Sequence, residues 1–129
     1  MKNKKTYKVV KKTYKDRKLY SYLVIEYGDK YWYQNGNLHR EEDLPAIEYT
    51  DGSQQWYKEG KLHREGDLPS VYYADGTKGW YKEGKLHREG GLPAIEWNGG
   101  DKEWYYEGEK LKVNCNEEAL RLIKMKAFW

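Results

Sequence analysis

Aromatic, aliphatic and glycine positions recur along this chain with a period of 24 residues. Each tryptophan of the series is followed four residues later by a glycine, and then by histidine–arginine and leucine–proline pairs in most units. Two units are nearly identical, WYKEGKLHREGDLP at 56–69 and WYKEGKLHREGGLP at 80–93. A fixed period of this kind is typical of architectures in which each repeat packs only on its neighbours. The tryptophans that mark the units are Trp32, Trp56, Trp80 and Trp104.

The turn residues predict that each unit is built from β-hairpins. Asp51-Gly52 and Asp75-Gly76 separate short runs rich in aromatic and β-branched residues, which is the pattern of a two-residue hairpin loop. In the same way Gly28-Asp29 and Gly99-Gly100 turn the first and last of these hairpins. This register places an aliphatic residue opposite each tryptophan, in the pairs Ile25–Trp32, Ile47–Trp56, Val71–Trp80 and Ile95–Trp104. A second turn follows each tryptophan, at Asn35-Gly36, Glu59-Gly60, Glu83-Gly84 and Glu107-Gly108.

The predicted fold is mainly β, an elongated single-layer antiparallel meander of 24-residue hairpin repeats with a short C-terminal capping helix. Residues 1–31 form a basic N-terminal cap, with a hairpin over 6–27 that turns at Asp16-Arg17. Residues 32–112 hold three full repeats and a partial fourth, and 113–129 hold the helix, all in one domain. Asn116 is the expected N-cap of that helix, and its apolar face, which packs on the last strand, is Ala119, Leu120, Ile123 and Ala127.

These motifs resemble the MORN-type β-hairpin repeats, especially their shorter bacterial and viral variants. The matching features are aromatic-x-x-G-x-x-H, followed by an aromatic strand and an Asp-Gly turn, as in WYKEGK and the ADGT of 74–77. The similarity covers roughly residues 22–112, whereas the HREGDLP segment departs from the pattern. The resemblance implies an elongated sheet that serves as a scaffold or binding surface without catalytic activity. Some relatives look like antitoxins of toxin–antitoxin pairs, and others have been linked to membrane lipids.

Composition favours an ordered protein of a reducing compartment, so a cytoplasmic location is expected. The chain has 14 Tyr and 6 Trp, and its one cysteine excludes an internal disulfide. The longest apolar run, Leu23-Val24-Ile25, is too short for a membrane span.

Charge is concentrated at the N-terminus. Residues 1–18 contain nine bases and one acid, and the remaining 15 bases and 20 acids leave residues 19–129 at −5. Lysines on an outer strand block edge pairing, or alternatively contact nucleic acid or anionic lipid. The lysines concerned are Lys4, Lys5, Lys8, Lys11, Lys12 and Lys15.

Catalysis, a metal and a cofactor are not expected. His39, His63 and His87 occupy equivalent positions in repeats about 9–10 Å apart, too far to share a zinc ion that needs ligands at about 2.0–2.3 Å. We expect each histidine to pack beside the tryptophan of its own repeat. The candidate nucleophiles, which lack a repeated histidine neighbour, are Ser21, Ser53, Ser70 and Cys115. The tryptophan series could stack single-stranded nucleic acid, but its cross-strand pairing favours an apolar layer.

The tyrosines are the predicted contacts for a protein partner, because tyrosine is enriched in interfaces. They are expected on the face opposite the tryptophans, with Ala46, Ser70 and Ala94 as small neighbours. The alternative, that the tyrosines only cover a thin sheet, stays open. Glu96 is expected to face Glu103 in a like-charge pair that awaits a cation. Arg40, Arg64 and Arg88 are each followed by Glu, which disfavours phosphate binding by the repeats. The tyrosines are Tyr33, Tyr57, Tyr81 and Tyr105.

The sequence therefore predicts a non-catalytic repeat module for protein–protein interaction, and in its sharpest form an inhibitor or antitoxin that covers a basic nucleic-acid-processing enzyme. The glutamates and arginines above join the tyrosines as predicted partner contacts. The alternatives are nucleic-acid binding through the basic N-terminal hairpin, binding to anionic lipid, and a scaffold whose open edges pair between copies, so that the chain is a monomer or an edge-paired homo-oligomer.

Overall fold

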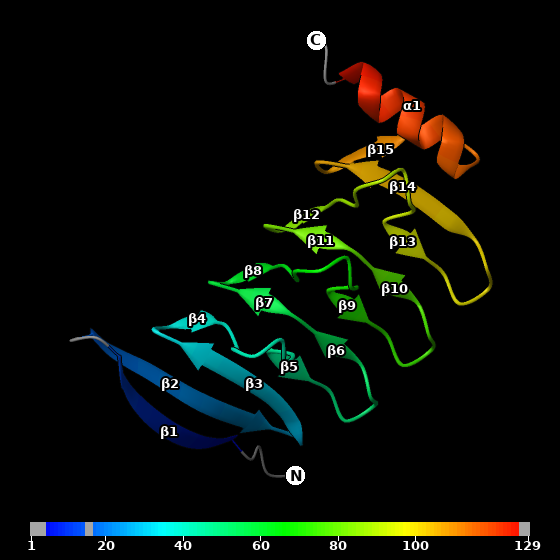
Figure 1. The fold of residues 1–129 in the computed structure, drawn as a ribbon. Coiled ribbons are helices and arrows are strands. Elements are labelled where there is room, and N and C mark those ends of the chain that lie inside the picture. Colours follow the sequence, from blue (N-terminus) through cyan, green and yellow to red (C-terminus); the bar gives the residue numbers. More distant parts are fainter. Residues whose placement is uncertain (1–4, 15–16, 127–129) are drawn as a thin grey trace.

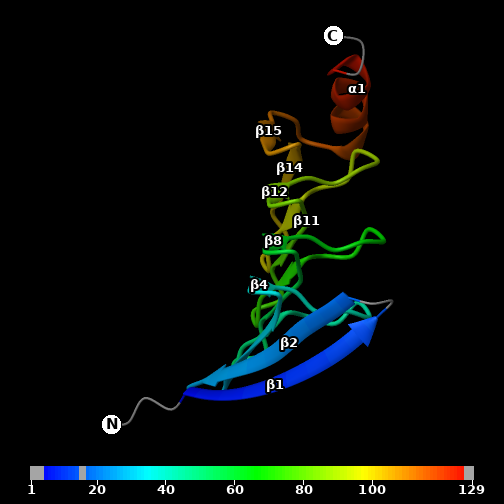
Figure 2. The same ribbon diagram turned by 90° about the vertical axis from the view of Figure 1, so that its left-hand side faces the viewer.

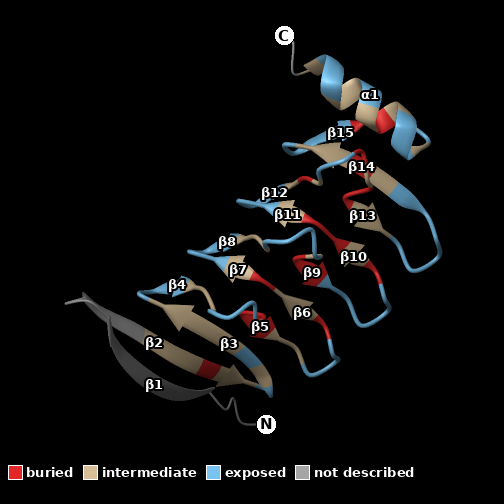
Figure 3. Cartoon of the chain, viewed as in Figure 1, coloured by how far each residue is buried: buried red, intermediate tan, exposed pale blue. Residues whose placement is uncertain are grey.

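The chain forms one large open antiparallel sheet of hairpins that ends in a short helix, as the sequence predicts (Figure 1). The computed structural model describes residues 5–14 and 17–126, with side chains from residue 21 onward. Seen along its edge, the repeat region is a single layer, with the helix beyond the last strand (Figure 2). Buried residues run along the middle of this layer, and the turns on both sides are exposed (Figure 3).

Two long strands, β1 (Lys5–Tyr14) and β2 (Arg17–Glu26), open the sheet, and β3 (Asp29–Gln34) pairs with β2. The main ladder runs β1-β2-β3-β5-β6-β9-β10-β13-β14-β15, while β4 pairs with β3, β7 with β8, and β11 with β12. The short strands are β4 (Asn37–Leu38), β5 (Ile47–Glu48), β6 (Gln54–Gln55), β7 (Tyr57–Lys58), β8 (Lys61–Leu62), β9 (Val71–Tyr72), β10 (Lys78–Gly79), β11 (Tyr81–Lys82), β12 (Lys85–Leu86), β13 (Ile95–Glu96), β14 (Lys102–Tyr106) and β15 (Glu109–Leu111).

The turns that follow the tryptophans are confirmed. In the second repeat, Glu59 and Gly60 have φ of 50° and 86°, and the strands pair Lys58 with Lys61 across them. Two successive left-handed residues in a two-residue loop define the type I′ turn, whose twist matches that of the sheet. This turn brings Trp56 opposite His63, whose backbone nitrogen donates to the Trp56 carbonyl at 3.0 Å.

The Asp-Gly turns are one residue longer than predicted. Tyr49 N donates to Ser53 O at 2.9 Å and Gly52 N donates to Tyr49 O at 3.0 Å, which closes a three-residue loop with Gly52 at φ 96°. This is the type I turn with a glycine bulge. The extra residue shifts the register by one and moves every side chain to the other face. The aliphatic residues therefore face not the tryptophans but the residues before them, in the pairs Ile47–Gln55, Val71–Gly79 and Ile95–Glu103.

The first two hairpins also turn earlier than expected. Tyr27 and Gly28 occupy the loop between β2 and β3, with φ of 53° and 87°, so Ile25 faces Lys30 and Leu23 faces Trp32. Arg17 belongs to β2 and pairs with Tyr14, which excludes a turn at Asp16-Arg17. The two residues between these strands, 15–16, lie outside the described residues.

Alternation along the strands gives the repeats two distinct faces. One face, which we name the tyrosine face, carries the aliphatic residues together with tyrosines, and Ile47 and Val71 are buried there at 4% and 2% exposure. The other, the tryptophan face, carries the tryptophans and the arginines. The sequence predicted that the aliphatic residues and the tryptophans form one apolar layer. In the structure they lie on opposite faces of the sheet.

The helix α1 (Asn116–Lys126) caps the last strand. Trp104, Leu111 and Ala119 form a buried cluster, against which Leu122 and Ile123 pack, so the predicted docking of the helix is confirmed. The predicted N-cap is wrong, because the first helical bond runs from Ala119 N to the Cys115 carbonyl. The Asn116 side chain instead accepts a hydrogen bond from Trp104 Nε1 at 3.0 Å. Ala127, like the last two residues, lies outside the described residues, and no helix of the described chain is long and apolar enough to cross a membrane.

Candidate functional site

On the tryptophan face, each arginine lies flat over the tryptophan of its own repeat. The guanidinium carbon is 3.6 Å from the Trp32 ring centroid for Arg40, and 3.8 Å from the Trp56 and Trp80 rings for Arg64 and Arg88. Stacking of this kind combines cation–π attraction with burial of the apolar ring. The tryptophans thus pack under arginines and not under the aliphatic residues predicted.

Two of these arginines, Arg64 and Arg88, join successive repeats. Arg64 donates through Nε and Nη2 to the two carboxylate oxygens of Asp43 at 2.9 and 3.1 Å, and through Nη1 to the Pro69 carbonyl at 3.1 Å. Arg88 repeats the arrangement with Asp67 and Pro93, and Arg40 donates to Pro45 O and Glu48. The guanidinium groups of Arg40, Arg64 and Arg88 all have partners within the chain, so these three arginines hold the sheet together where the sequence suggested partner contacts.

The histidines make a second connection between repeats. Nδ1 of His39, His63 and His87 accepts a hydrogen bond from the backbone nitrogen twenty residues later, at 3.0, 3.1 and 2.9 Å. Since Nδ1 accepts, the neutral ring carries its proton on Nε2, which faces Glu41, Glu65 or Glu89. The described residues contain no group of three potential ligands that could hold a metal ion.

The predicted pair of facing glutamates does not form. The register places Glu96 opposite Lys102, and its carboxylate accepts from Arg88 at 3.2 Å. Glu103 lies opposite Ile95 and accepts from Trp97 Nε1 at 2.9 Å and from the Tyr105 hydroxyl at 3.2 Å. These hydrogen bonds lower the pKa of Glu103, that from Trp97 most. Both carboxylates are therefore already compensated, and the cause of the error is the one-residue shift of the last hairpin.

The predicted tyrosines do share one face, and they are half-buried over the aliphatic residues. Burial, followed by the neighbouring tyrosines, raises the pKa of Tyr57 and Tyr81. The Tyr57 hydroxyl donates to Gln55 at 3.1 Å, as that of Tyr105 does to Glu103. Tyr33 stacks on Tyr22, with ring centroids 5.1 Å apart. These rings cover the sheet, and only part of each is free to meet a partner.

A second aromatic row on this face was missed by the sequence reasoning. Tyr49, Tyr73 and Trp97 follow the aliphatic residues by two positions and recur at the same 24-residue offset. Tyr73 and Trp97 are 46% and 45% exposed, whereas the tyrosines of the predicted row are half-buried. Their period was visible in the sequence, but the predicted register assigned Tyr49 and its equivalents no common role.

Carboxylates lie beside this second row. Asp51 and Asp75 sit in the three-residue loops, where each accepts a 2.8 Å hydrogen bond from a backbone nitrogen two residues on. The pKa of Tyr49 is raised by burial first and then by the negative charges of Asp29 and Asp51 and by Tyr73. The exposed aromatic rings therefore border on negative charge.

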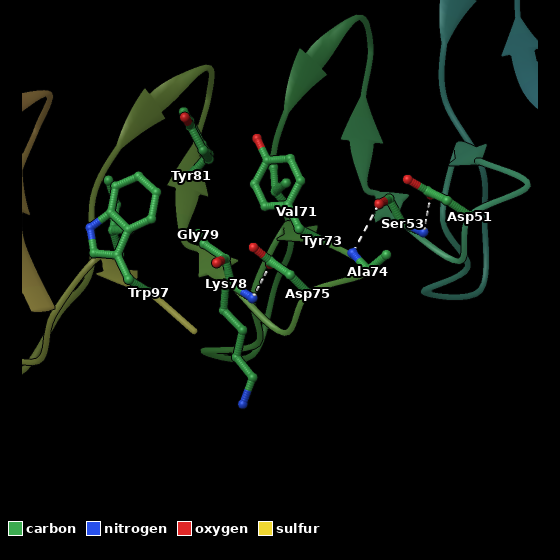
Figure 4. Close-up of a pocket in the computed structure, with 12 residues that line it drawn as sticks. Asp51, Ser53, Val71, Tyr73, Ala74, Asp75, Lys78, Gly79, Tyr81 and Trp97 are labelled. Carbon is green, nitrogen blue, oxygen red and sulfur yellow. Dashed lines mark hydrogen bonds between the residues drawn. The ribbon is translucent and has the colours of Figure 1, made fainter. Parts of the chain in front are cut away.

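A groove opens on this face at the third repeat, with a volume of about 490 Å³. Figure 4 shows Tyr73, Tyr81 and Trp97 around Gly79, with Asp75 at the rim. Gly79 stands where the neighbouring repeats carry Gln55 and Glu103, directly before the tryptophan. Without a side chain here, the ring of Tyr81 lies against Gly79 and no side chain of this position projects into the groove. The signal in the sequence was one glycine that breaks the repeat.

Two of the candidate nucleophiles, Ser53 and Ser70, accept hydrogen bonds from the backbone. Ser53 Oγ accepts from Ala74 N at 3.0 Å, and Ser70 Oγ accepts from Tyr81 N at 2.8 Å. Cys115 Sγ donates to Glu118 at 3.6 Å, next to the helix start. Ser53 and Ser70 thus support the backbone of the neighbouring strands and turns.

Comparison of the chain with protein-family models, with curated proteins and with solved structures finds no match.

Proposed function

We propose that this chain is a non-catalytic repeat module that binds a protein partner through its tyrosine face. The observation that carries the proposal is the row of Tyr49, Tyr73 and Trp97, in which Tyr73 and Trp97 are nearly half exposed beside a groove. Aromatic side chains with limited rotational freedom supply much of the binding energy at protein interfaces. The recurring arginines and histidines of the other face, in contrast, are engaged in contacts within the chain.

The proposed partner has a basic surface. Residues 19–129 carry five more acids than bases, and Asp51 and Asp75 border the exposed rings. Complementary charge speeds association and selects among partners. Enzymes that process nucleic acids commonly present such a basic surface, so an inhibitor or antitoxin that covers one is the specific form of this proposal. The resemblance of the hairpin motif to MORN-type repeats supports the same role.

Affinity capture with matched variants tests this function. The tagged chain is used to capture proteins from its native cells, in parallel with the double variants Tyr73→Ala/Trp97→Ala and Tyr72→Ala/Lys102→Ala. The second pair lies on the tryptophan face, and Tyr72 is 38% exposed, close to Tyr73. A partner recovered by the wild type and by the tryptophan-face variant, but lost with the tyrosine-face variant, supports the proposal. Equal recovery by both variants contradicts it.

Nucleic-acid binding through the basic N-terminal hairpin is the second candidate, favoured by the nine bases in residues 1–18. The strands of this hairpin, β1 and β2, lie at one end of the sheet. Binding through these lysines would weaken steeply as salt rises, since phosphate contacts release counterions. A salt titration with single-stranded RNA or DNA, repeated after deletion of residues 1–18, separates this function from protein binding by the tyrosine face.

A further inference from the structure

The groove includes Gly79, a position at which the neighbouring repeats carry a side chain. Gly79 pairs with Val71 on one side and Ile95 on the other, and Tyr73 and Trp97 follow these two residues on the same face. The strands that flank β10 are therefore about 10 Å apart. In the preceding repeat Gln55 fills the equivalent position between Ile47 and Val71. At Gly79, which is buried, the ring of Tyr81 lies 3.3 Å from where a Cβ would stand, and the groove opens beside it between Tyr73 and Trp97.

The chemistry of the groove suits a cation. Tyr73, Tyr81 and Trp97 supply ring faces, and the carboxylates of Asp51 and Asp75 line the same groove. Lys78 lines it only through its position in β10, because its Nζ lies 5.6 Å from the ring centroid of Tyr72 on the opposite face. Within the described part of the chain, no basic side chain stacks on the three rings of the groove or pairs with its two carboxylates.

The chain itself shows how it binds a cation in such surroundings. Arg64 lies over Trp56 while the carboxylate of Asp43 accepts its Nε and Nη2 hydrogen bonds. A planar guanidinium fits between flat rings and can pair with a carboxylate at the same time, which an ammonium does less well. The groove offers the same two elements, a tryptophan ring and an aspartate, without the arginine.

We propose that the groove at Gly79 takes an arginine side chain of a protein partner, held between Tyr73 and Trp97 with Asp75 as its counter-ion. This inference rests on the proposed function and names the residue that the tyrosine face recognises. Trp97 is prepared for the contact, because its Nε1 donates to Glu103 and fixes the ring orientation. Asp75 keeps one carboxylate oxygen for the ligand while the other accepts from Thr77 N.

Titration with short peptides tests the inference. The probes are blocked pentapeptides with arginine, lysine or the uncharged isostere citrulline between glycines, and the readout is the NMR signal of the Trp97 indole N–H, assigned with Trp97→Phe. We expect a saturable shift with the arginine peptide and an affinity lower by about tenfold for citrulline, as loss of a cation–π contact implies. No saturable shift, equal affinity for citrulline, or tighter binding of lysine would overturn the proposal.

Two variants localise the site. Gly79→Gln restores the side chain of the neighbouring repeat. Its Cβ lies 3.3 Å from the edge of the Tyr81 ring, which must shift slightly, and the new side chain should obstruct the groove between Tyr73 and Trp97. Asp75→Asn keeps the acceptor for Thr77 and removes the charge. Both should lose arginine binding, by about tenfold for Gly79→Gln, with unfolding temperatures close to the wild type. Unchanged affinity in both variants would contradict the site.

The outcome also separates this inference from the proposed function. If the peptides fail to bind while capture of the partner still depends on Tyr73 and Trp97, only the inference of an arginine pocket is contradicted. Recovery of the partner by the Tyr73→Ala/Trp97→Ala variant would contradict the proposed function itself.

Discussion

Nδ1 of His63 lies 3.1 Å from the backbone nitrogen of Glu83, in the turn of the next repeat. The backbone N–H can only donate, so the histidine acts as an acceptor and fixes the spacing of two neighbouring hairpins. The same contact occurs at His39 and His87. The three histidines therefore connect neighbouring repeats, which explains why they recur without forming a metal site.

Replacement of His63 by alanine should lower the free energy of unfolding by about 1 kcal/mol, the typical value for one hydrogen bond. Asparagine places an oxygen close to the position of Nδ1, whereas glutamine places its polar atoms closer to Nε2. We therefore expect His63→Asn to retain more stability than His63→Gln in urea unfolding. Equal losses in the two variants would show that the contact to Glu83 contributes nothing.

Gly91 makes room for the capping helix and should not tolerate a side chain. A Cβ at this position would lie 2.8 Å from the carbonyl oxygen of Asn116 and from the Cβ of Leu120. Gly90 has a similar φ, 76° against 73°, but nothing within 4 Å of its Cβ position. Gly91→Ala should therefore be less stable than Gly90→Ala by about 1–3 kcal/mol, the cost of overpacking.

Thermal unfolding of both variants measures this difference, and the common strain of a left-handed alanine cancels between them. Far-UV circular dichroism and hydrogen exchange of α1 show whether the helix has detached. Equal stability of the two variants would mean that the helix does not pack on this loop.

The half-buried tyrosines should make the protein sensitive to alkali. Burial raises the pKa of Tyr57 and Tyr81 in the folded chain above the ordinary value of about 10. Since the unfolded chain then loses these protons first, stability is complete below pH 10 and falls as the pH rises through the folded pKa. The double variant Tyr57→Phe/Tyr81→Phe should show a smaller loss in urea unfolding between pH 9 and pH 11. If the double variant loses as much stability as the wild type over this pH range, these hydroxyls are solvent-exposed in the folded chain.

The ion pair between Asp43 and Arg64 should affect how the stability of the protein falls at acid pH. The hydrogen bond from Arg64 holds the pKa of Asp43 below its usual value, so the contribution of this pair is present above about pH 4 and is lost as the pH falls through the folded pKa. The carboxylate is 53% exposed, so Asp43→Asn should cost only about 0.5 kcal/mol at pH 7. That difference should shrink toward pH 2, and a difference that is constant with pH would contradict the assignment.

The sequence predicted the fold from its period and from turn residues whose geometry is local. Asn35-Gly36 and its equivalents were predicted at the correct positions because two left-handed residues fit only one kind of tight hairpin. Asp51-Gly52 was misread, since the same dipeptide also ends a three-residue loop, and only the hydrogen bonds of Tyr49 distinguish the two. Because the loop is one residue longer than predicted, the aliphatic side chains lie on the opposite face from the tryptophans.

The site was predicted less well for the same reason. The predicted tyrosine row is present, but the more exposed row of Tyr73 and Trp97 became visible only with the correct register. The arginines and Glu96 looked available because their partners lie 21 and 8 residues away in the sequence, beyond any local pattern. Gly79 carried a signal of its own, as a break in an otherwise regular repeat.

Photo-crosslinking from adjacent positions tests the central claim, that the tyrosine face is the binding surface. Tyr72 and Tyr73 are neighbours with similar exposure on opposite faces of the sheet, so each can carry the photoreactive residue benzoylphenylalanine with little disturbance. Irradiation of the chain with its captured partner should give a covalent adduct from position 73 and little or none from position 72. Adducts from position 72 alone, or equally from both, would contradict the account.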